Sequence, residues 1–154
     1  MMERPPKRLQ GPPGLGPMVE GRAIVSKHGF NARYDLNRVS GVFSRPEHDH
    51  FGASPAGKIF FFSTPRGGIA TSWALLDLQS RSLAPIGLVC RRANPVVAQG
   101  AALSGMALLD RLEPDPLLHV QTGDWVRLTP ASGLLEIFHG DARADTASPS
   151  RPLA

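Results

Sequence analysis

Short apolar runs separated by longer polar passages dominate this chain. The runs at 18–26 (MVEGRAIVS), 58–63 (KIFFFS) and 84–91 (APIGLVCR) have the length of strands. The second and third are nearly continuous, which predicts strands buried on both faces of a sheet. After the second run, Ile69, Trp73 and Leu76 stand at i, i+4 and i+7, and Leu75 and Leu78 widen this stripe. The spacing predicts a helix over 69–80 with the apolar stripe in the core.

The second half of the chain combines small residues with short apolar segments. Residues 96–109 predict a short helix that leads into a turn or strand. Residues 117–120, 124–128 and 134–138 have the composition of short strands, with turns between them. The resulting order is a strand, a long loop, two strand–helix units and a strand meander. We therefore predict a mixed α/β domain.

The two ends and one internal segment are polar. Residues 1–17 and 139–154 are poor in large apolar residues and rich in Pro, Gly, Ser and charge. This composition predicts disordered tails around an ordered body at 18–138. Residues 27–57 form a long polar passage inside the body, and a loop of that length is uncommon in a compact domain unless it serves function.

Composition narrows the class of protein. The 154 residues suit one domain, and 16 glycines with 15 prolines argue against a long helical bundle. The single cysteine, Cys90, excludes an internal disulfide and a multi-cysteine metal centre, so we predict that the chain binds no metal of its own. No secretory signal or membrane-spanning stretch is evident, which favours a cytoplasmic protein without a membrane partner.

The net charge of +4 raises nucleic-acid binding as an alternative function. The basic residues are dispersed, however, and within the body only Arg91 and Arg92 are adjacent. Grooves that follow a phosphate backbone usually combine basic residues with exposed aromatic side chains, and that combination is scarce here. We therefore expect no nucleic-acid partner, and an assay of salt-dependent affinity tests this rival.

The stretch at 58–78 (KIFFFSTPRGGIATSWALLDL) is the most informative part of the sequence. A strand ends in a glycine turn at Gly67 and Gly68, which opens directly into the predicted helix. Backbone N–H groups at a helix start favour an anion, and Arg66, Thr71 and Ser72 can add side-chain donors. The GK[ST] ending of a nucleotide-binding loop is absent, which excludes that class of NTPase. The alternative is an ordinary turn in which Thr71 or Ser72 caps the helix.

A second candidate lies at 47–54 (EHDHFGAS). His48 and His50 flank an aspartate and can bind a metal or carry protons near neutral pH. No third ligand is evident nearby, although zinc sites normally use three or four. The alternative is a pair of loop histidines that face solvent.

Together these stretches resemble the small subunit, or swivel domain, of the aconitase X family of dehydratases. The resemblance covers nearly all of the predicted body, and it rests on the order and spacing of several short motifs. The family pattern has H-x-x-x-G-x-S in a loop, G-K before an apolar strand, a glycine turn that opens a helix, an A-P segment and an A-x-G-A motif. The matching residues are 48–54 (HDHFGAS), 57–58 (GK), 66–67 (RG), 84–86 (API) and 98–101 (AQGA).

The resemblance implies a swivelling β/β/α domain similar to the mobile domain of aconitase. It implies a heterodimer in which a large subunit holds an iron–sulfur cluster. The pair would dehydrate a small hydroxylated acid such as cis-3-hydroxy-L-proline or phosphomevalonate. A single cysteine agrees with a cluster held by another chain, because such clusters need several thiolates.

The resemblance also implies roles for residues around the glycine turn. Arg66 would bind a substrate carboxylate, and Gly67 and Gly68 would shape the anion-binding turn. Many relatives have a serine at the position of Gly68, where it is taken as the base that removes the substrate proton. The base role would then pass to Thr71, to Ser72 or to the large subunit, and Ser72 is the candidate proton acceptor in this chain. His48 would touch the substrate or the partner.

The loss of that serine leaves a second interpretation open. The chain can instead be a binding or regulatory module that kept the swivel fold and lost catalysis.

Overall fold

Buried strands form where the sequence has its continuous apolar runs. The computed structural model describes residues 5–138, so the predicted tail at 139–154 lies outside the described residues. The strands are β1 (Lys7–Gln10), β2 (Val19–Val25), β3 (Ile59–Phe61), β4 (Gly87–Val89), β5 (Ala107–Leu109), β6 (Trp125–Thr129) and β7 (Leu134–Phe138). The helices are α1 (Ala32–Asp35), α2 (Ile69–Ser80) and α3 (Pro95–Ser104), with 3₁₀ turns η1 (Pro116–Leu118) and η2 (Pro130–Ser132).

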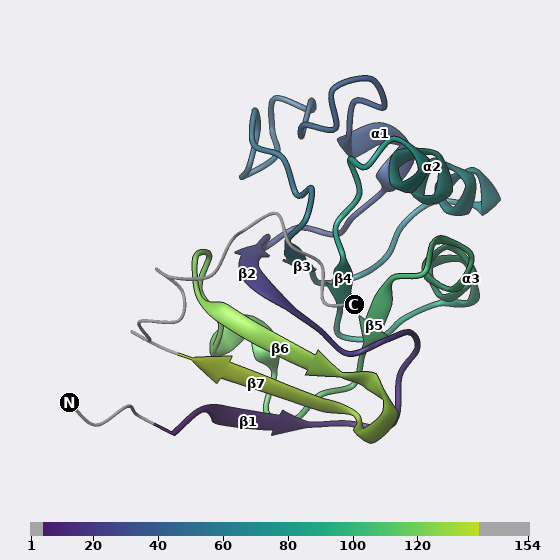
Figure 1. Cartoon of the computed structure of the whole chain (residues 1–154). Helices are drawn as coiled ribbons and strands as arrows, with labels where there is room; N and C mark the ends of the chain where they lie inside the picture. The colour runs from purple at the N-terminus through teal and green to yellow at the C-terminus, as the bar shows by residue number, and fades with distance from the viewer. Residues whose placement is uncertain (1–4, 139–154) are drawn as a thin grey trace.

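The strands form one mixed sheet in the order β1-β7-β6-β2-β3-β4-β5. Strands β2 to β5 are parallel, and β1, β7 and β6 run antiparallel to their neighbours. Strand β2 joins the two halves, because residues 19–22 pair with β6 and residues 23–25 pair with β3. The sheet therefore curls at β2, and Figure 1 shows the antiparallel strands below and the helices grouped above them at the right.

Two hydrophobic clusters fill the two sides of the parallel strands. Phe60 and Phe62 belong to a helix-side core that contains Leu75 and Leu78 of α2. Ile59 and Phe61 belong to a strand-side core with residues of the curled antiparallel strands. Alternate side chains of a strand point to opposite faces, so β3 needs an apolar residue at every position. The mixed α/β class and the strands within 18–26, 58–63 and 84–91 are confirmed.

The predicted helices are also confirmed, and their ends have local causes. Helix α2 spans the predicted 69–80. Helix α3 begins at Asn94, whose Oδ1 accepts a hydrogen bond of 2.8 Å from the Val97 amide, and Pro95 fits the first turn. It ends at Gly105, whose φ of 68° is the left-handed conformation that glycine adopts readily. Strand β5 follows, as the segment 96–109 predicted.

The predicted core stripe of α2 is right for Leu75 and Leu78, which are buried, and wrong for Ile69 and Trp73. Ile69 is 62% exposed and Trp73 57% exposed. The buried side consists of Thr71, Ser72, Ala74, Leu75 and Leu78. Small side chains on that side let α2 approach α3 closely, and this packing decides which of the two apolar faces is covered.

The N-terminal prediction is wrong as well. Residues 7–10 of the expected disordered tail form β1, which pairs with β7. Leu9 is fully buried in the strand-side core, and Leu15 exchanges backbone hydrogen bonds with Leu108 at 3.0 and 2.9 Å. One apolar side chain and strand pairing with a distant partner order this segment, despite its Pro-rich composition.

Two further segments differ from expectation. Residues 117–120 do not form a strand, because Pro116 opens the 3₁₀ turn η1 and the Asp115 carboxylate accepts a hydrogen bond of 3.0 Å from the Leu117 amide. The passage 27–57 contains the short helix α1, and Phe30 and Phe43 from it are buried in the helix-side core.

Candidate functional site

The glycine turn lies at the carboxyl edge of the parallel strands. Residues 62–68 connect β3 to α2, and the Arg66 amide donates a hydrogen bond of 2.8 Å to the Phe30 carbonyl. On the other side, the Arg91 amide donates to the Ser63 carbonyl at 3.1 Å, which joins the loops after β3 and β4. Ligands of open α/β sheets bind at this edge, so the turn has the position of a binding site.

The two glycines of the turn have different surroundings. Gly67 has a φ of 100°, and a Cβ there would lie 2.4 Å from Thr71 Oγ1 and 2.7 Å from Asn31 Nδ2. Gly68 begins α2 without a side-chain cap, and a Cβ there would meet nothing within 4 Å. The turn therefore needs glycine at 67, while position 68 opens onto free space.

The start of α2 presents hydrogen-bond donors to that space. The Thr71 amide bonds the Gly68 carbonyl at 2.9 Å, and within residues 5–138 the amides of Ile69 and Ala70 have no acceptor. Such amides and the helix dipole favour an anion. The sequence predicts an anion site at this helix start, and no side chain of the described residues fills the space at Gly68.

Arg66 carries a positive charge in the same turn, two residues before Gly68. Its side chain is exposed and passes over Gly29, where a Cβ would lie 2.4 Å from Arg66 Nε. No ion pair links Arg66 to another residue in the described range 5–138. An exposed guanidinium of this kind can bind a carboxylate or phosphate through two parallel hydrogen bonds.

Thr71 and Ser72 point into the protein. The Ser72 hydroxyl donates a hydrogen bond of 2.7 Å to the Val96 carbonyl of α3, and the residue is 1% exposed. The Thr71 hydroxyl faces Asn31 Oδ1 at 3.4 Å and is equally enclosed, with the residue 3% exposed. In this conformation neither hydroxyl reaches the space at Gly68, so the predicted base and donor roles of these residues lack geometric support.

His48 is buried rather than exposed to substrate or solvent. It is 3% exposed and stacks on Phe43 with ring centroids 4.2 Å apart. Its Nδ1 accepts a hydrogen bond of 3.0 Å from the His50 amide, and its buried Nε2 has no partner in the described residues. The predicted contact of His48 with substrate or partner is therefore not available in this conformation.

Burial controls the protonation of His48. Desolvation lowers the pKa of His48 below its usual 6.5, although the nearby Asp49 carboxylate acts in the opposite direction. The ring is therefore neutral at pH 7. Asp49 accepts hydrogen bonds of 2.9 Å from the Ser26 hydroxyl and the Lys27 amide, and these bonds outweigh desolvation and lower the pKa of Asp49. These two hydrogen bonds of Asp49 hold the polar passage 27–57 against the end of β2.

The metal alternative at these histidines is not supported. His50 Nε2 donates a hydrogen bond of 2.6 Å to the Val25 carbonyl, so it is already engaged. Across residues 5–138, no group of three or more His, Cys, Asp and Glu side chains is arranged to hold a metal ion. Cys90 is buried at the end of β4, where desolvation raises the pKa of its thiol to about 12. It is therefore not a thiolate ligand at neutral pH.

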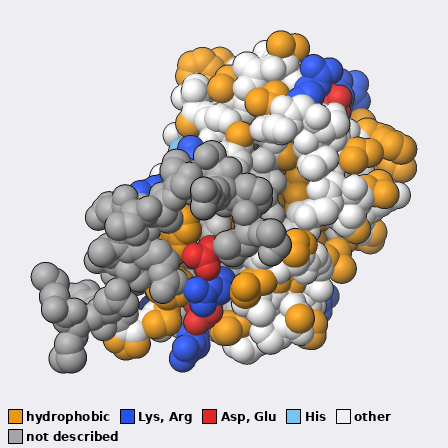
Figure 2. Space-filling view, in the orientation of Figure 1, with side chains coloured by type: hydrophobic (Ala, Val, Ile, Leu, Met, Phe, Trp, Pro, Cys, Tyr) orange, Lys and Arg blue, Asp and Glu red, His pale blue; other side chains and the backbone are white. Residues whose placement is uncertain are grey.

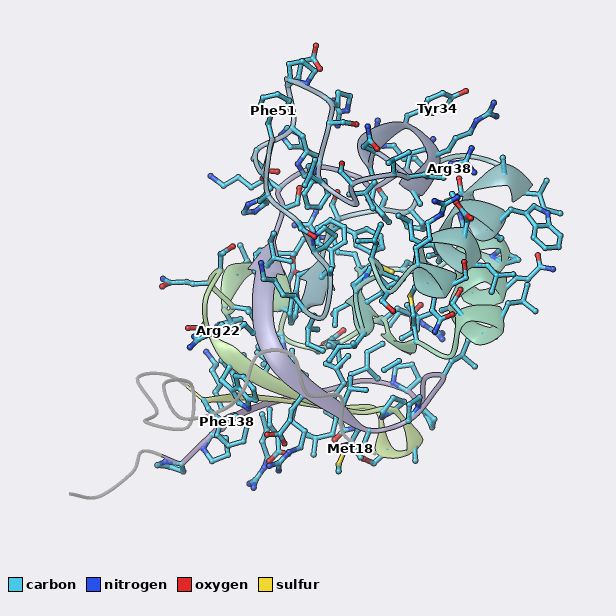
Figure 3. All side chains as sticks on the ribbon, turned by 45° about the horizontal axis from the view of Figure 1, so that its top comes forward. Met18, Arg22, Tyr34, Arg38, Phe51 and Phe138 are labelled. Carbon is cyan, nitrogen blue, oxygen red and sulfur yellow. The ribbon has the colours of Figure 1, made fainter. Side chains whose placement is uncertain are left out.

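The view in Figure 3 shows the polar passage and its exposed aromatic residues. Phe51 lies on the loop at the upper left, Tyr34 projects from α1, and Arg38 follows α1 in the chain. Tyr34 is 64% exposed and Phe51 59% exposed. Sequence reasoning assigned no role to Phe51 and marked Tyr34 only as an aromatic residue next to a basic one, Arg33, since isolated aromatic residues in a polar passage carry no periodic signal.

A hollow beyond the turn was also missed by sequence reasoning. A cavity of about 350 Å³ at the ends of β4 and β5 is lined by Arg91, Arg92 and Arg111 together with acidic residues. Arg91 pairs with Asp115 at 3.0 Å and Arg111 with Asp110 at 3.3 Å. These pairs largely balance the positive charge. In the sequence, the only sign of this cavity was the adjacent pair Arg91 and Arg92.

Comparison with known proteins identifies relatives along most of the chain. The sequence profile described as aconitase X swivel domain matches residues 8–137. The small subunit of phosphomevalonate dehydratase from Methanocella arvoryzae is 27% identical over 84% of this chain and 98% of the relative. The corresponding subunit from Pyrococcus abyssi is 32% identical over 79% of this chain and 91% of the relative.

Solved structures have the same fold. The crystal structure of Thermococcus kodakaraensis aconitase X in its holo-form superposes with a TM-score of 0.79 and 29% identity, covering 85% of this chain and 98% of that chain. The solution structure of a UPF0107 protein gives a TM-score of 0.78 at 24% identity, with coverage of 85% and 98%, and bears on the fold alone.

No helix within residues 5–138 is long and apolar enough to cross a bilayer.

Proposed function

The chain belongs to the aconitase X swivel domain family, and from this premise we propose that it is the small subunit of a dehydratase for a small hydroxylated acid. Its curated relatives are named phosphomevalonate dehydratase small subunits. Phosphomevalonate and cis-3-hydroxy-L-proline are the two candidate substrates, and both carry a carboxylate. The chain works with a large subunit that supplies the remainder of the active site.

The observation that carries this proposal is the open anion cradle at residues 66–70. The free amides of Ile69 and Ala70 lie at the start of α2, next to the open space at Gly68, and the exposed Arg66 stands two residues earlier in the same turn. A substrate carboxylate placed there accepts hydrogen bonds from the helix start and from Arg66. Binding of this group orients the acid toward the large subunit, and the turn excludes water when the two subunits close over it.

The chain binds and orients the substrate, and the large subunit removes the proton. Gly68 has no side chain at the position where many family members have serine. Thr71 and Ser72 are enclosed, and their hydroxyls bond to groups of this chain. A general base must lie within hydrogen-bond reach of the proton that it takes. The base therefore comes from the partner subunit.

The iron–sulfur cluster implied by the family also belongs to the large subunit in this proposal. Such clusters are held by several thiolates, and this chain has one cysteine, whose thiol is buried and protonated. The residues of this chain do not fit the cluster, so they take no part in holding it.

Dehydration by the reconstituted complex tests the role of Arg66. The full chain is co-purified with the aconitase X large subunit of the same organism, and loss of water from each candidate acid is followed. Removal of one preorganised donor typically costs about 10²–10³-fold in rate, so Arg66→Ala should lower kcat/KM by that order, and Arg66→Lys by less.

Arg81→Ala is the matched control, because Arg81 is an exposed arginine at the other end of α2 that pairs with Asp77 at 3.3 Å. It should leave kcat/KM within about twofold, as surface ion pairs contribute little. An Arg66→Ala complex that turns over as fast as the wild type would refute the substrate-binding role of the turn.

The glycine at 68 favours one rival, a binding or regulatory module without catalysis. That rival predicts a wild-type complex that forms but dehydrates neither acid. Gly68→Ser separates the two, because space at 68 admits the side chain. If the wild-type complex is inactive and Gly68→Ser creates activity, the regulatory interpretation holds. A wild-type complex with turnover excludes it.

A further inference from the structure

Helix α2 carries large apolar side chains on both of its faces. One side packs against α3 and the sheet, while Ile69 and Trp73, one turn apart on the other side, are 62% and 57% exposed. A helix on the surface of a globular protein normally presents polar residues to water. Within the described chain nothing covers these two side chains, so the outer face has the composition of a surface that is buried elsewhere.

The exposed stripe is continuous with the anion cradle. Ile69 directly follows Gly68, and its amide is one of the free donors, while Trp73 lies on the next turn. Figure 2 shows hydrophobic side chains gathered at the right edge, where α2 lies in Figure 1. Whatever binds this stripe therefore also borders the turn.

A further exposed aromatic residue stands on α1, the short helix that packs against α2. Tyr34 of α1 is 64% exposed, and α1 packs against α2. The guanidinium of Arg33 lies 5.2 Å from the centre of the Tyr34 ring. Trp, Tyr and Arg are the residues most enriched at the energetic centre of protein interfaces, because large rigid side chains bury much area at low entropic cost.

We propose that Ile69, Trp73 and Tyr34 form the docking surface for the large subunit, hereafter the α2 stripe. This inference rests on the proposed function, since it takes the partner from the family's division into small and large subunits. Docking on the α2 stripe places Arg66 and the cradle at the edge of the interface. The shared active site then forms where the apolar contact ends and the polar turn begins.

Other occupants fit less well. Residues 139–154 of this chain (HGDARADTASPSRPLA) contain one large aliphatic residue, Leu153, and no aromatic residue, so they offer little apolar surface to cover Trp73. A second copy of the small subunit would bury the stripe but would also block the cradle beside it. The large subunit alone leaves the cradle facing a substrate.

Binding measured without turnover tests the inference. Full-length wild-type chain, Trp73→Ala and Ile69→Glu are titrated against purified large subunit by calorimetry, with circular dichroism confirming the fold of each variant. Truncation of an interface hot spot costs about 30-fold or more in Kd, and we expect at least that loss for Trp73→Ala. Both side chains are exposed, so the variants should fold normally.

The control is Leu118→Ala, because Leu118 is 77% exposed on η1, whose neighbours Leu117 and Val120 pack in the strand-side core on the other side of the sheet. Its Kd should equal that of the wild type. An unchanged Kd for Trp73→Ala, a wild-type chain that does not bind the large subunit, or self-association of the small subunit through the stripe would each overturn the inference.

The same samples separate this inference from the proposed function. Arg66→Ala should bind the large subunit with the wild-type Kd and lose turnover. If Trp73→Ala weakens binding while the wild-type complex dehydrates no acid, the docking surface stands and the proposed reaction falls. If the complex is active and Trp73→Ala binds normally, the reaction stands and the docking surface falls.

Discussion

Gly67 and Gly68 are adjacent, but only the first is required by the backbone. Gly67 has a φ of 100° and is enclosed by Thr71 and Asn31, whereas Gly68 faces open space. We expect Gly67→Ala to lower the free energy of unfolding by about 1–3 kcal/mol through left-handed strain and overlap. Gly68→Ala should change it by less than about 1 kcal/mol, since only the N-cap preference differs.

Urea unfolding of the two glycine variants measures this difference. The geometry of the turn requires that Gly67→Ala lowers the free energy of unfolding more than Gly68→Ala does. Equal losses, or a larger loss for Gly68→Ala, would show that the backbone of the turn differs from the one described.

The buried ring of His48 makes stability depend on pH. Its pKa in the folded chain lies below the usual 6.5, so between these two values the unfolded chain binds more protons. The stabilisation by neutral His48 is thus complete above about pH 6.5 and is lost as the pH falls below it, by at most about 1.4 kcal/mol per pH unit. The lowered pKa of Asp49 also stabilises the fold, and this stabilisation is lost only when the pH falls below 3.8.

Unfolding curves at pH 7.5, 6.5 and 5.5 check the His48 prediction. The wild type should lose stability across this range faster than His48→Gln, whose side chain does not titrate. Parallel pH dependence of the two proteins would mean that His48 is not buried in its neutral form.

Single residues differ in how far the sequence determines their role. Arg66 and the two glycines could be assigned to the turn, because a strand, a glycine pair and a helix follow one another without interruption. The burial of Ser72 and Thr71 could not be predicted, since it depends on which side of α2 meets α3. His48 gave no signal of its stacking on Phe43, because both lie in a passage without periodicity.

The crossing of α2 and α3 depends on Gly100, the glycine of the A-x-G-A motif. A Cβ at this position would lie 2.9 Å from Leu75 Cδ1 and 3.1 Å from Ser72 Cα, a backbone atom that cannot move alone. We expect Gly100→Val to destabilise the fold by about 2–3 kcal/mol through overpacking. Thermal and urea unfolding measure the effect.

Ala102→Val on the same helix is the control, since Ala102 is exposed. It should cost only about 0.5 kcal/mol, the difference in helix propensity. Similar losses at both positions would contradict the close approach of the two helices.

Elements with continuous apolar runs or a clear cap were predictable, and elements defined by distant pairing were not. Strand β3 needs apolar residues on both faces, so its sequence is a continuous apolar run that identifies it as a buried strand. Strand β1 has one buried residue, Leu9, and exists because β7, far along the chain, supplies its hydrogen-bond partners. The outer face of α2 was predicted to be core because it is apolar. Its stripe makes no core contact within residues 5–138, so the apolar pattern alone did not identify the buried face.

In the whole molecule, the glycine turn before α2 lies outside both the helix-side and the strand-side core. Helices cover one side of the parallel strands and the curled antiparallel strands cover the other, so the carboxyl edge at Gly68 stays open. The mixed α/β class followed from the order of elements along the sequence. The curl at β2 did not, because it depends on one strand that pairs with β6 through one half and with β3 through the other.

A crystal structure of the small and large subunits together, with a hydroxylated acid or an inert analogue bound, tests the central claim most directly. The account predicts an anionic oxygen of the ligand within about 3 Å of the Arg66 guanidinium or of the amides of Ile69 and Ala70. A ligand bound entirely by the large subunit, with residues 66–70 turned toward solvent, would contradict it.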